Sequence, residues 1–533
     1  MSHILLNNID LWTSAVRHKS TAGRGSNRKL ELAGINKLRE LILELAVRGK
    51  LVPQNPDDEP ASELLKRIEA EKAQLVKDGK LKKQKPLPPV TDEEKPFELP
   101  QGWEWVRLGN LAECQAGFAF KSSQFNDTGD GLPLIRIRDV GHDFSGTFYS
   151  GEYRPEFLVE KGDYLISMDG IFRVAKSNLD FGLLNQRVSR LNFFSNQAKK
   201  DLIVIALQGE LSKLQGVKAY TTVDHLSGKQ IQDACIPLPP ANEQHRIVTK
   251  VDELMALCDQ LEQQSEHQLD AHQQLTETLL ATLTDAASAQ ELSDNWQRLA
   301  QHFDLLFSGP MGAWAIDRLK DTILQLSFEG ALSSAPRHQT TLKNCLSFGP
   351  KNGLSPKPVE HETKLQVLKL GATSTGTFNL EETKYVPEID NIDEHLPLKE
   401  NDILLQRGNT AIYVGSNVLI HQNYPHIIYP DLMMKIRVKP EFSPKFISLA
   451  LSSPKSRQHM WSKMTGTSGT MPKISKKVVE SVPISVYSLE EQNRIVAKVD
   501  ELFALCDQLK ERLQHASDTQ LSLTDAIVEQ ALN

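Results

Sequence analysis

The stretch EQHRIVTKVDELMALCDQLE, residues 243–262, occurs a second time as EQNRIVAKVDELFALCDQLK at residues 491–510. Sixteen of the twenty positions are identical at a constant offset of 248 residues. Identity this close, so far apart in one chain, indicates a duplicated unit rather than a chance match. The sequence therefore predicts two copies of one structural plan.

A fainter repeat accompanies the first. INKLRELILELAVRGKLV (residues 35–52) matches IDRLKDTILQLSFEGALS (residues 316–333), and NIDLW (8–12) weakly echoes HFDLL (302–306). We therefore expect the first of these helical segments and the helix that ends the chain to form the same arrangement as the central helical pair.

Both copies carry apolar residues at alternating spacings of four and three, the pattern of a coiled-coil seam. A helix from residue 243 to residue 284 would be roughly 60 Å long at ~1.5 Å per residue. With a single apolar stripe it requires a partner. The duplicate helix is the expected partner; the alternative is that each stripe packs on its own domain. The seam residues are Ile247, Val251, Leu254, Cys258 and Leu261 in the first copy, and Ile495, Val499, Leu502, Cys506 and Leu509 in the second.

Composition limits the class of protein. Hydrophobic residues make up 40% of the 533, which is enough to form cores, and no apolar run has the ~18 residues that a membrane span needs. The amino end lacks the basic segment and apolar core of a signal peptide. The five cysteines form no C-x-x-C pair, so we expect a reduced, cytoplasmic protein without metal-binding cysteines.

The net charge of −7 is unevenly distributed. Residues 101–236 carry 15 basic and 16 acidic side chains, whereas residues 336–485 carry 19 and 13. The acidity therefore lies mainly in the helical segments. The basic block is suited to a phosphate backbone, although a solvated basic surface explains the charge equally well.

Periodicity divides the chain into helical and β-rich segments. The β-rich segments consist of short apolar or alternating runs separated by Gly, Asp and Asn, and KGDYLIS (161–167) resembles ENDILLQ (400–406). Similar scaffolds therefore carry different loops. The predicted domains are 1–100 (a helical region with a Lys- and Pro-rich linker), 101–236 (β-rich), 237–335 (central helices), 336–484 (β-rich) and 485–533 (the last helix). The sequence assigns no role to residues 1–30 and 286–312.

Motifs for catalysis are missing from the sequence. It has no G-x-G-x-x-G segment, no phosphate-binding G-x-x-x-x-G-K-S/T loop and no H-E-x-x-H metal motif. It also has no N-P-P-F or D-P-P-Y tetrapeptide, which would hold a target amine. We therefore expect a chain without catalytic residues or a metal site, whose chemistry is supplied by partners.

The duplicated motif and its flanks resemble a known family. IPLPPANEQHRIVTKVDEL, preceded by HLSGKQIQDAC, is similar to the junction between a target-recognition domain and a conserved region in the specificity subunits of type I restriction–modification systems. KISKKVVESVPISVYSLEEQNRIVAKVDEL resembles the same junction. GINKLRELILELAVRGKLVPQNPDDEPASELLKRIEAEKAQL and LPQGWEWVRLGNLAECQAG resemble the amino-terminal conserved region and the start of the first recognition domain. The resemblance covers essentially the whole chain.

This resemblance implies an α+β fold: two β-rich target-recognition domains, separated by a long antiparallel coiled coil of conserved helices in a pseudo-twofold circular layout. Each recognition domain would bind one half of a bipartite, asymmetric sequence in double-stranded DNA. Two modification (methyltransferase) subunits and the restriction subunits, which are translocases, would dock on the chain. The resemblance places S-adenosylmethionine, ATP and magnesium on those partners, with no cofactor in this chain.

Base reading favours Arg or Lys for guanine, and Asn or Gln for adenine, on loops that reach the major groove. For each such residue, an ordinary surface or strand position is the competing interpretation. Arg136 and Arg138 share a face if they lie on a strand. The candidates are Lys121, Arg136, Arg138, Arg173, Lys176, Asn185, Gln186, Arg187 and Arg190 in the first β-rich block, and Lys369, Arg407, Asn409, Lys435, Arg437, Lys463, Lys473, Lys476 and Lys477 in the second.

Two other functional classes remain open on the sequence. The acidic helices and the nearly neutral first β-rich block suit a coiled-coil adaptor that joins proteins and never binds nucleic acid. A self-contained methyltransferase or nuclease is the third hypothesis, and the missing motifs disfavour it.

Overall fold

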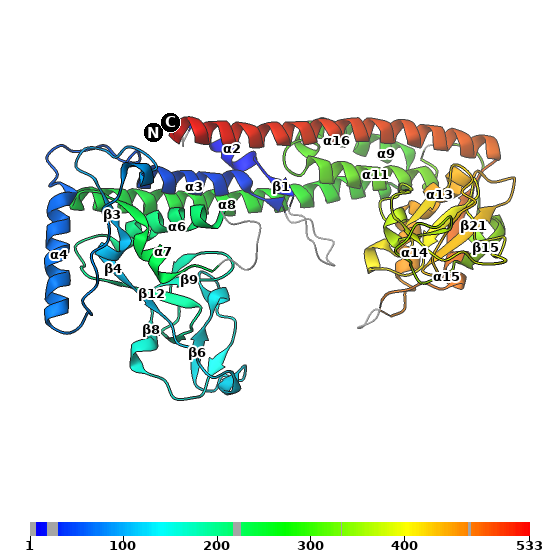
Figure 1. Ribbon diagram of the computed structural model, residues 1–533. Coiled ribbons are helices and arrows are strands. Elements are labelled where there is room, and N and C mark those ends of the chain that lie inside the picture. Colours follow the sequence, from blue (N-terminus) through cyan, green and yellow to red (C-terminus); the bar gives the residue numbers. More distant parts are fainter. Residues whose placement is uncertain (1–6, 19–29, 217–224, 332, 467–470, 533) are drawn as a thin grey trace. The chain divides into compact units, whose positions relative to one another are not determined.

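The computed structural model describes residues 7–18, 30–216, 225–331, 333–466 and 471–532 (Figure 1). These residues form helices and short-stranded β-sheets, so the expected α+β class is confirmed. In the described part of the chain, no helix is long and apolar enough to cross a membrane.

The chain divides into two compact units, each of which gathers separate stretches of sequence. Unit 1 comprises residues 1–13, 33–263 and 523–533, and unit 2 comprises residues 14–32 and 264–522. Within unit 1, the Lys50 ammonium donates a 2.6 Å hydrogen bond to the backbone oxygen of Leu532. The last helix therefore returns to the first helical region, as the circular layout requires.

The duplicated stretch forms the start of two long helices, α8 (Ala241–Thr284) and α16 (Leu489–Leu532), each of 44 residues. Their first residues are separated by the same offset as the sequence repeat. The predicted long helices are confirmed. Each contributes residues to both compact units.

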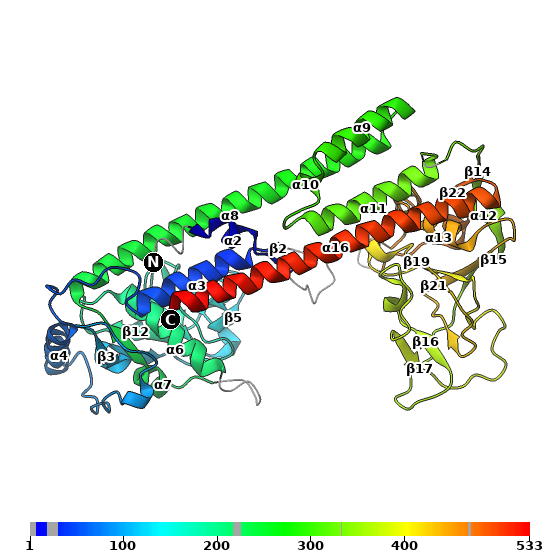
Figure 2. The ribbon, with the colours of Figure 1, turned by 90° about the horizontal axis from the view of Figure 1, so that it is seen from above.

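The seams of these helices are covered mainly by two shorter helices, α3 (Ala33–Val47) and α11 (Gly312–Glu329). Figure 2 shows α3 beside the first part of α8, and α11 beside α16. All five residues of the first seam are buried; in the second, Ile495, Val499 and Cys506 are buried while Leu502 and Leu509 are half-buried.

The contacts of the seams correct the expected partner. Leu254, Cys258 and Leu261 line a small cavity together with Leu38 and Ile42 of α3. In unit 2, Leu502, Cys506 and Leu509 pack in one cluster with Ile316, Leu319 and Ile323 of α11. These seam residues thus pack on the short helix of their own copy, whereas the sequence favoured the other long helix as partner. The later part of α8 does join the second seam, because Leu279 and Leu283 lie in the same cluster as Leu502 and Cys506.

The short helices end in the same way. Gly49 follows α3 with φ +68°, and Gly330 follows α11 with φ +100°, a backbone conformation that favours glycine. The amides of Lys50 and Ala331 each donate a 2.9 Å bond to a carbonyl oxygen five residues back. The two helices therefore end at corresponding glycines, which shows that the fainter repeat is also structural.

The weakest repeat is structural as well. Helices α2 (Ile9–Ser14) and α10 (Phe303–Leu306) occupy the echoing segments, and Trp12 and Leu306 are both fully buried. The remaining helices of the helical regions are α4 (Ala61–Lys77) and α9 (Ala289–Gln301), and a short β1–β2 pair joins Arg17–His18 to Leu30–Glu31. Residues 286–312 therefore consist mainly of α9 and α10.

The first β-rich part has a four-stranded sheet in the order β10-β9-β12-β4 and a five-stranded sheet in the order β5-β7-β6-β11-β8, while β3 pairs with β13. Its strands are β3 (Glu104–Arg107), β4 (Ala112–Ala116), β5 (Phe125–Asn126), β6 (Leu132–Ile135), β7 (Phe148–Tyr149), β8 (Leu158–Glu160), β9 (Tyr164–Ser167), β10 (Val174–Lys176), β11 (Phe181–Leu184), β12 (Val188–Phe193) and β13 (Cys235–Leu238). Its helices are α5 (Leu108–Leu111), α6 (Lys200–Gly216) and α7 (Gly228–Asp233).

The second β-rich part repeats this topology with fewer strands. Its four-stranded sheet has the order β15-β21-β18-β19, its three-stranded sheet has the order β17-β16-β20, and β14 pairs with β22. The β6–β11 and β16–β20 pairs are both parallel. The strands are β14 (His338–Thr341), β15 (Leu346–Asn352), β16 (Gln366–Leu368), β17 (Thr383–Tyr385), β18 (Ile403–Gln406), β19 (Asn417–Leu419), β20 (Ile427–Ile428), β21 (Met433–Val438) and β22 (Pro483–Val486); the helices are α12 (Leu342–Cys345), α13 (Pro444–Ser452), α14 (Pro454–Trp461) and α15 (Lys476–Glu480).

A buried amide attaches each β-rich part to its long helix. The Gln244 side chain accepts a 2.7 Å bond from the amide of Lys199, just before α6, and donates to the oxygen of Pro239. In the second copy, Gln492 accepts from the amide of Ser443, just before α13, and donates to the oxygen of Tyr487. Both amides are almost completely buried. This attachment explains why the glutamine of the motif is identical in both copies.

The Lys- and Pro-rich segment expected to be a linker is attached to the first β-rich part. The buried Arg107 guanidinium donates to the backbone oxygens of Pro88 and Pro89 and to both carboxylate oxygens of Glu94, at 2.9 and 2.7 Å. Leu81 is buried at the other end of the segment. Residues 81–94 are therefore a fixed strap, which corrects the linker interpretation.

A second contact that occurs in both copies engages three of the candidate DNA-binding residues in ion pairs within the protein. Asp163 and Asp402 follow equivalent turns, accepting the amides of Glu160 and Lys399. Arg190 donates to Asp163 at 3.1 Å, and the fully buried Lys435 lies 2.9 Å from Asp402. Both cations also donate to equivalent backbone oxygens, those of Leu158 and Pro397. Arg437 forms an ion pair with Asp402 as well, and its guanidinium lies over the Phe348 ring. Lys435 is thus buried, and the partly exposed Arg190 and Arg437 are engaged in ion pairs within the protein.

Substitution of Asp402 tests the buried pair. D402N leaves the Lys435 ammonium without a charged partner, so we expect the free energy of unfolding of unit 2 to fall by about 3–5 kcal/mol. The matched control is D163N, because Arg190 retains Leu158, Gln115 and Glu156 as acceptors. We expect a loss of only about 1 kcal/mol there. Chemical denaturation of the two variants measures both values; equal losses would contradict the difference in burial.

Substitution of Glu94 tests the strap. Hydrogen bonds from Arg107 lower the pKa of Glu94 from 4.5 to about 2, so the attachment is intact above pH ~4.5 and is lost as the pH falls towards 2. At neutral pH, E94Q weakens it, and we expect faster tryptic cleavage after the exposed Lys82, Lys83 and Lys85. The neighbouring E93Q should leave the cleavage rate unchanged.

Candidate nucleic-acid interface

In the first β-rich part, candidate residues gather around the loop that follows β9. The amide of Arg173, just before β10, donates to Ser167 Oγ at the end of β9, at 2.9 Å, and this bond holds the two ends of the loop together. The Arg173 guanidinium contacts the His142 ring, and a Cβ placed on Gly141 would lie 2.8 Å from Arg173 Cδ. The β9–β10 loop therefore packs against the loop after β6.

The other side of the same loop is held by Asp169. Its carboxylate accepts from Arg187 at 2.9 Å and lies 2.6 Å from His225 Nδ1, while the amide of Leu226 donates to the oxygen of Met168. The Asp169 side chain is only 11% exposed, whereas Arg187 and His225 are more than half exposed. The acid thus orients two exposed basic side chains.

Arg136 and Arg138 lie on a 3₁₀ turn instead of the expected strand, since β6 ends at Ile135 and residues 137–139 form the turn. Asp139 stabilises the turn by accepting the amides of Arg136 and Ser145. Both guanidinium groups donate to Thr147 Oγ1, at 3.4 and 3.1 Å. The two side chains therefore point the same way, as expected, although for a different reason.

The second β-rich part places different side chains at the equivalent positions. Arg407 and Asn409 follow β18, and Lys473 pairs with Gly408 as His225 pairs with Asp169. Lys369 precedes a 3₁₀ turn, as Arg136 does. The Gln406 side chain donates to Leu370 O and Thr373 Oγ1, which ties the end of β18 to that turn. Lys369, Arg407, Asn409 and Lys473 thus lie in one neighbourhood.

The other candidates lie apart from these clusters or are engaged elsewhere. Lys176 forms a 2.6 Å ion pair with Asp201 at the far end of the β9–β10 hairpin, and Asn185 is buried in the turn before β12. Gln186 is exposed next to Arg187, and Lys463 lies 3.0 Å from His459. Lys121 is exposed before a short 3₁₀ turn, while Lys476 and Lys477 begin α15. Residues 467–470, between Lys463 and Lys473, lie outside the described residues.

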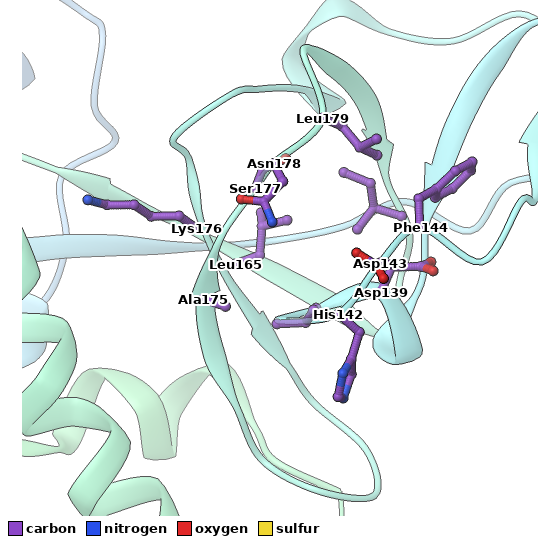
Figure 3. Close-up of a pocket in the computed structure, with 12 residues that line it drawn as sticks. Asp139, His142, Asp143, Phe144, Leu165, Ala175, Lys176, Ser177, Asn178 and Leu179 are labelled. Atoms are coloured by element: carbon purple, nitrogen blue, oxygen red, sulfur yellow. The ribbon is translucent and has the colours of Figure 1, made fainter. Parts of the chain in front are cut away.

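A cavity of about 200 Å³ borders the first cluster (Figure 3). Figure 3 shows Asp143 and Phe144 on one side and Ser177 and Asn178 on the other, with the Lys176 side chain extending away. The buried Ser177 Oγ has no hydrogen-bond partner among the described residues. In the same part of the chain, no group of three or more His, Cys, Asp or Glu side chains is arranged to hold a metal ion.

Sequence reasoning missed the residues that organise the clusters, namely His142, Asp169 and His225. One signal was available for His225, because His225-Leu226-Ser227 aligns with Lys473-Ile474-Ser475 at the offset of the repeat. The role of Asp169 had no such signal, since its counterpart is Gly408. What the two copies share here is the backbone, and what differs is the side chains on it.

Comparison with known proteins identifies the family. A model of the type I restriction modification DNA specificity domain matches residues 100–271 and 357–516. The chain is 35% identical over 595 residues to the specificity subunit of type I restriction enzyme EcoEI of Escherichia coli, and 34% identical over 596 residues to that of EcoAI from the same organism, with 99% of both chains covered each time. A solved chain from a study of assembly and conformational transition in a type I R-M system is 17% identical, with a TM-score of 0.50, and the match covers 82% of this chain and 99% of that one.

The solved chain supports the fold, and the two relatives support the function, because each matches this chain from end to end. Proteins of this kind are non-catalytic and provide the DNA sequence specificity of their enzymes. This chain belongs to the specificity subunits of type I restriction–modification systems.

Proposed function

We propose that this chain reads a bipartite, asymmetric DNA sequence, with one β-rich part on each half, and that it docks modification and restriction subunits which carry out the chemistry. The observation that carries the proposal is one backbone framework with different side chains at matching positions. Arg136 is replaced by Lys369, Asp169 by Gly408 and His225 by Lys473. Two alike scaffolds with unlike contact residues suit two different DNA half-sites.

The two clusters suit different modes of contact. In the first, Arg187 is oriented by an acid and Arg173 is fixed by the return of the loop, so both present guanidinium groups for bidentate contact with guanine. In the second, Lys473 lies on a short bridge beside Gly408 in the part of the chain with a basic excess. A lysine on a backbone bridge suits a phosphate contact, which strengthens binding without selecting bases.

Exchange of the first β-rich part tests the proposal directly. Residues 101–236 are replaced by the corresponding block of another specificity subunit, with Arg107 retained so that the strap stays attached and Gln244 left in place outside the block. We expect one half of the methylated sequence to change and the other half to remain. Mapping of methylated adenine in cells that contain the modification partner measures this. Loss of both halves in a stable, assembled complex would overturn the proposal.

Single substitutions test the first cluster. We expect R187A and R173A each to reduce affinity for the preferred DNA by about 1–3 kcal/mol and to relax selection at one position. Lys161 is the control, since it is exposed in the same part and pairs with Asp180 at the opposite end of β9 from this loop. K161A should leave base selection unchanged. Binding by the assembled complex to a panel of single-base DNA variants distinguishes these outcomes.

Substitution of Lys473 tests the phosphate contact. K473A should weaken binding almost uniformly across sequences and reduce the slope of log affinity against log salt by about 1. A change in base preference without a change in salt dependence would assign Lys473 to base reading instead.

A further inference from the structure

The two helix pairs, α3 with α8 and α11 with α16, contain the same four polar positions beside the apolar seam. Positions 36, 39, 259 and 262 of the first pair correspond to positions 317, 320, 507 and 510 of the second. Two of the four are alike in charge, because Arg39 corresponds to Lys320 and Asp259 to Asp507. The other two differ and carry the inference that follows.

In the first pair, one cation on the short helix binds two acids on the long helix. Arg39 Nη2 lies 2.6 Å from Asp259 Oδ1 and 2.6 Å from Glu262 Oε2. In the second pair, the contact of Lys320 with Asp507 is kept, but Lys510 Nζ lies 2.6 and 2.8 Å from the two oxygens of Asp317. On the long helix, the acidic Glu262 of the first pair is therefore replaced by the basic Lys510 in the second. On the short helix, the neutral Asn36 is replaced by the acidic Asp317.

Most apolar residues of the seam are identical in the two pairs, although Met255 of the first corresponds to Phe503 of the second. Leu254, Cys258 and Leu261 have identical counterparts in α16, and the α3 residues Ile35, Leu38, Ile42 and Leu45 have identical counterparts in α11. A groove built from α8 would therefore accept either short helix by shape. Selection between them has to come from residues that differ.

The differing charges oppose the exchanged pairing. If α11 packed on α8, Asp317 would face Glu262; if α3 packed on α16, Lys510 would face Arg39 without a carboxylate at position 36. Each exchanged pair gains one repulsion, Asp317 with Glu262 or Arg39 with Lys510, whereas the observed contacts of these residues are all attractive. Single exposed ion pairs contribute little, but like charges brought together across an interface select strongly against a wrong partner.

We propose that the coupled charge changes at positions 36/317 and 262/510 assign each short helix to its own long helix. The partner that they exclude is the other short helix, whether it comes from the same chain or from a second copy of this chain. This inference is independent of the proposed function, since no DNA or partner subunit takes part in the contact. It makes the two copies distinguishable at a contact where most of their seam residues are identical.

A thiol introduced into α3 reports the pairing in the full-length chain. Leu38 and Cys258 line the same small cavity, and Cys258 and Cys506 are the corresponding residues of the two long helices. In L38C, oxidation should join position 38 to Cys258 at least tenfold more often than to Cys506. Mass spectrometry of the digested protein identifies the cross-link, and light scattering separates exchange within one chain from exchange between two.

Reversal of the charges provides the test. In L38C with E262K and K510E, we expect the cross-link to Cys506 to rise at least tenfold relative to that with Cys258. Adding N36D and D317N gives the α3–α8 pair the charges of the natural α11–α16 pair, and the α11–α16 pair those of the natural α3–α8 pair. The cross-link should then return to Cys258. An unchanged Cys258 cross-link in the E262K and K510E chain would overturn the proposal.

A simpler variant keeps the test decisive if the reversed chain fails to fold. E262K alone should lower the midpoint of thermal unfolding, and adding N36D should restore it, because the new carboxylate and ammonium would then face each other as those of Asp317 and Lys510 do in the second pair. D317N is the matched control in the other copy and should lower the midpoint without affecting the first pair. Failure of N36D to rescue E262K would also overturn the proposal.

Discussion

A helix of 44 residues with one apolar stripe has to be covered along its length, and this requirement shapes the chain. The first part of the α8 stripe is covered by α3 and that of the α16 stripe by α11, while Leu279 and Leu283 of α8 pack in the cluster of unit 2. Because α3 precedes the first β-rich part and α8 follows it, their packing closes that part into a loop held at both ends. The same holds for α11, the second β-rich part and α16. The separation of the chain into attachment helices and reading domains follows from this packing.

Much of the helical architecture could be predicted, because its signals are periodic and occur twice. The offset of 248 residues locates the starts of α8 and α16, and the glycine at position 49 marks the end of α3. The partner of each seam could not be predicted, since the two short helices carry the same apolar residues at four corresponding positions. The polar residues that differ between the copies become informative only when the contacts are known.

The candidate DNA-binding residues were harder to predict, because charge alone does not reveal whether a side chain is free. Arg190 and Lys435 have the residue types of base readers, yet both are held by acids that follow equivalent turns. Their pairing depends on strand register, which sequence patterns do not fix. Arg107 likewise has the sequence context of an ordinary strand residue, and its attachment to Pro88, Pro89 and Glu94 arises from contacts with a segment whose regular structure is a single short 3₁₀ turn, Asp92–Glu94.

The buried side chains of Gln244 and Gln492 attach the two β-rich parts by the same contact, because each accepts a hydrogen bond from a backbone amide of its β-rich part. A backbone amide is present whatever the side chain, so this contact places almost no demand on the rest of the domain's sequence. Genetic recombination within the nearly identical stretches would therefore transfer a whole reading domain intact. New sequence preferences would then arise in single steps, without prior adjustment of the helices.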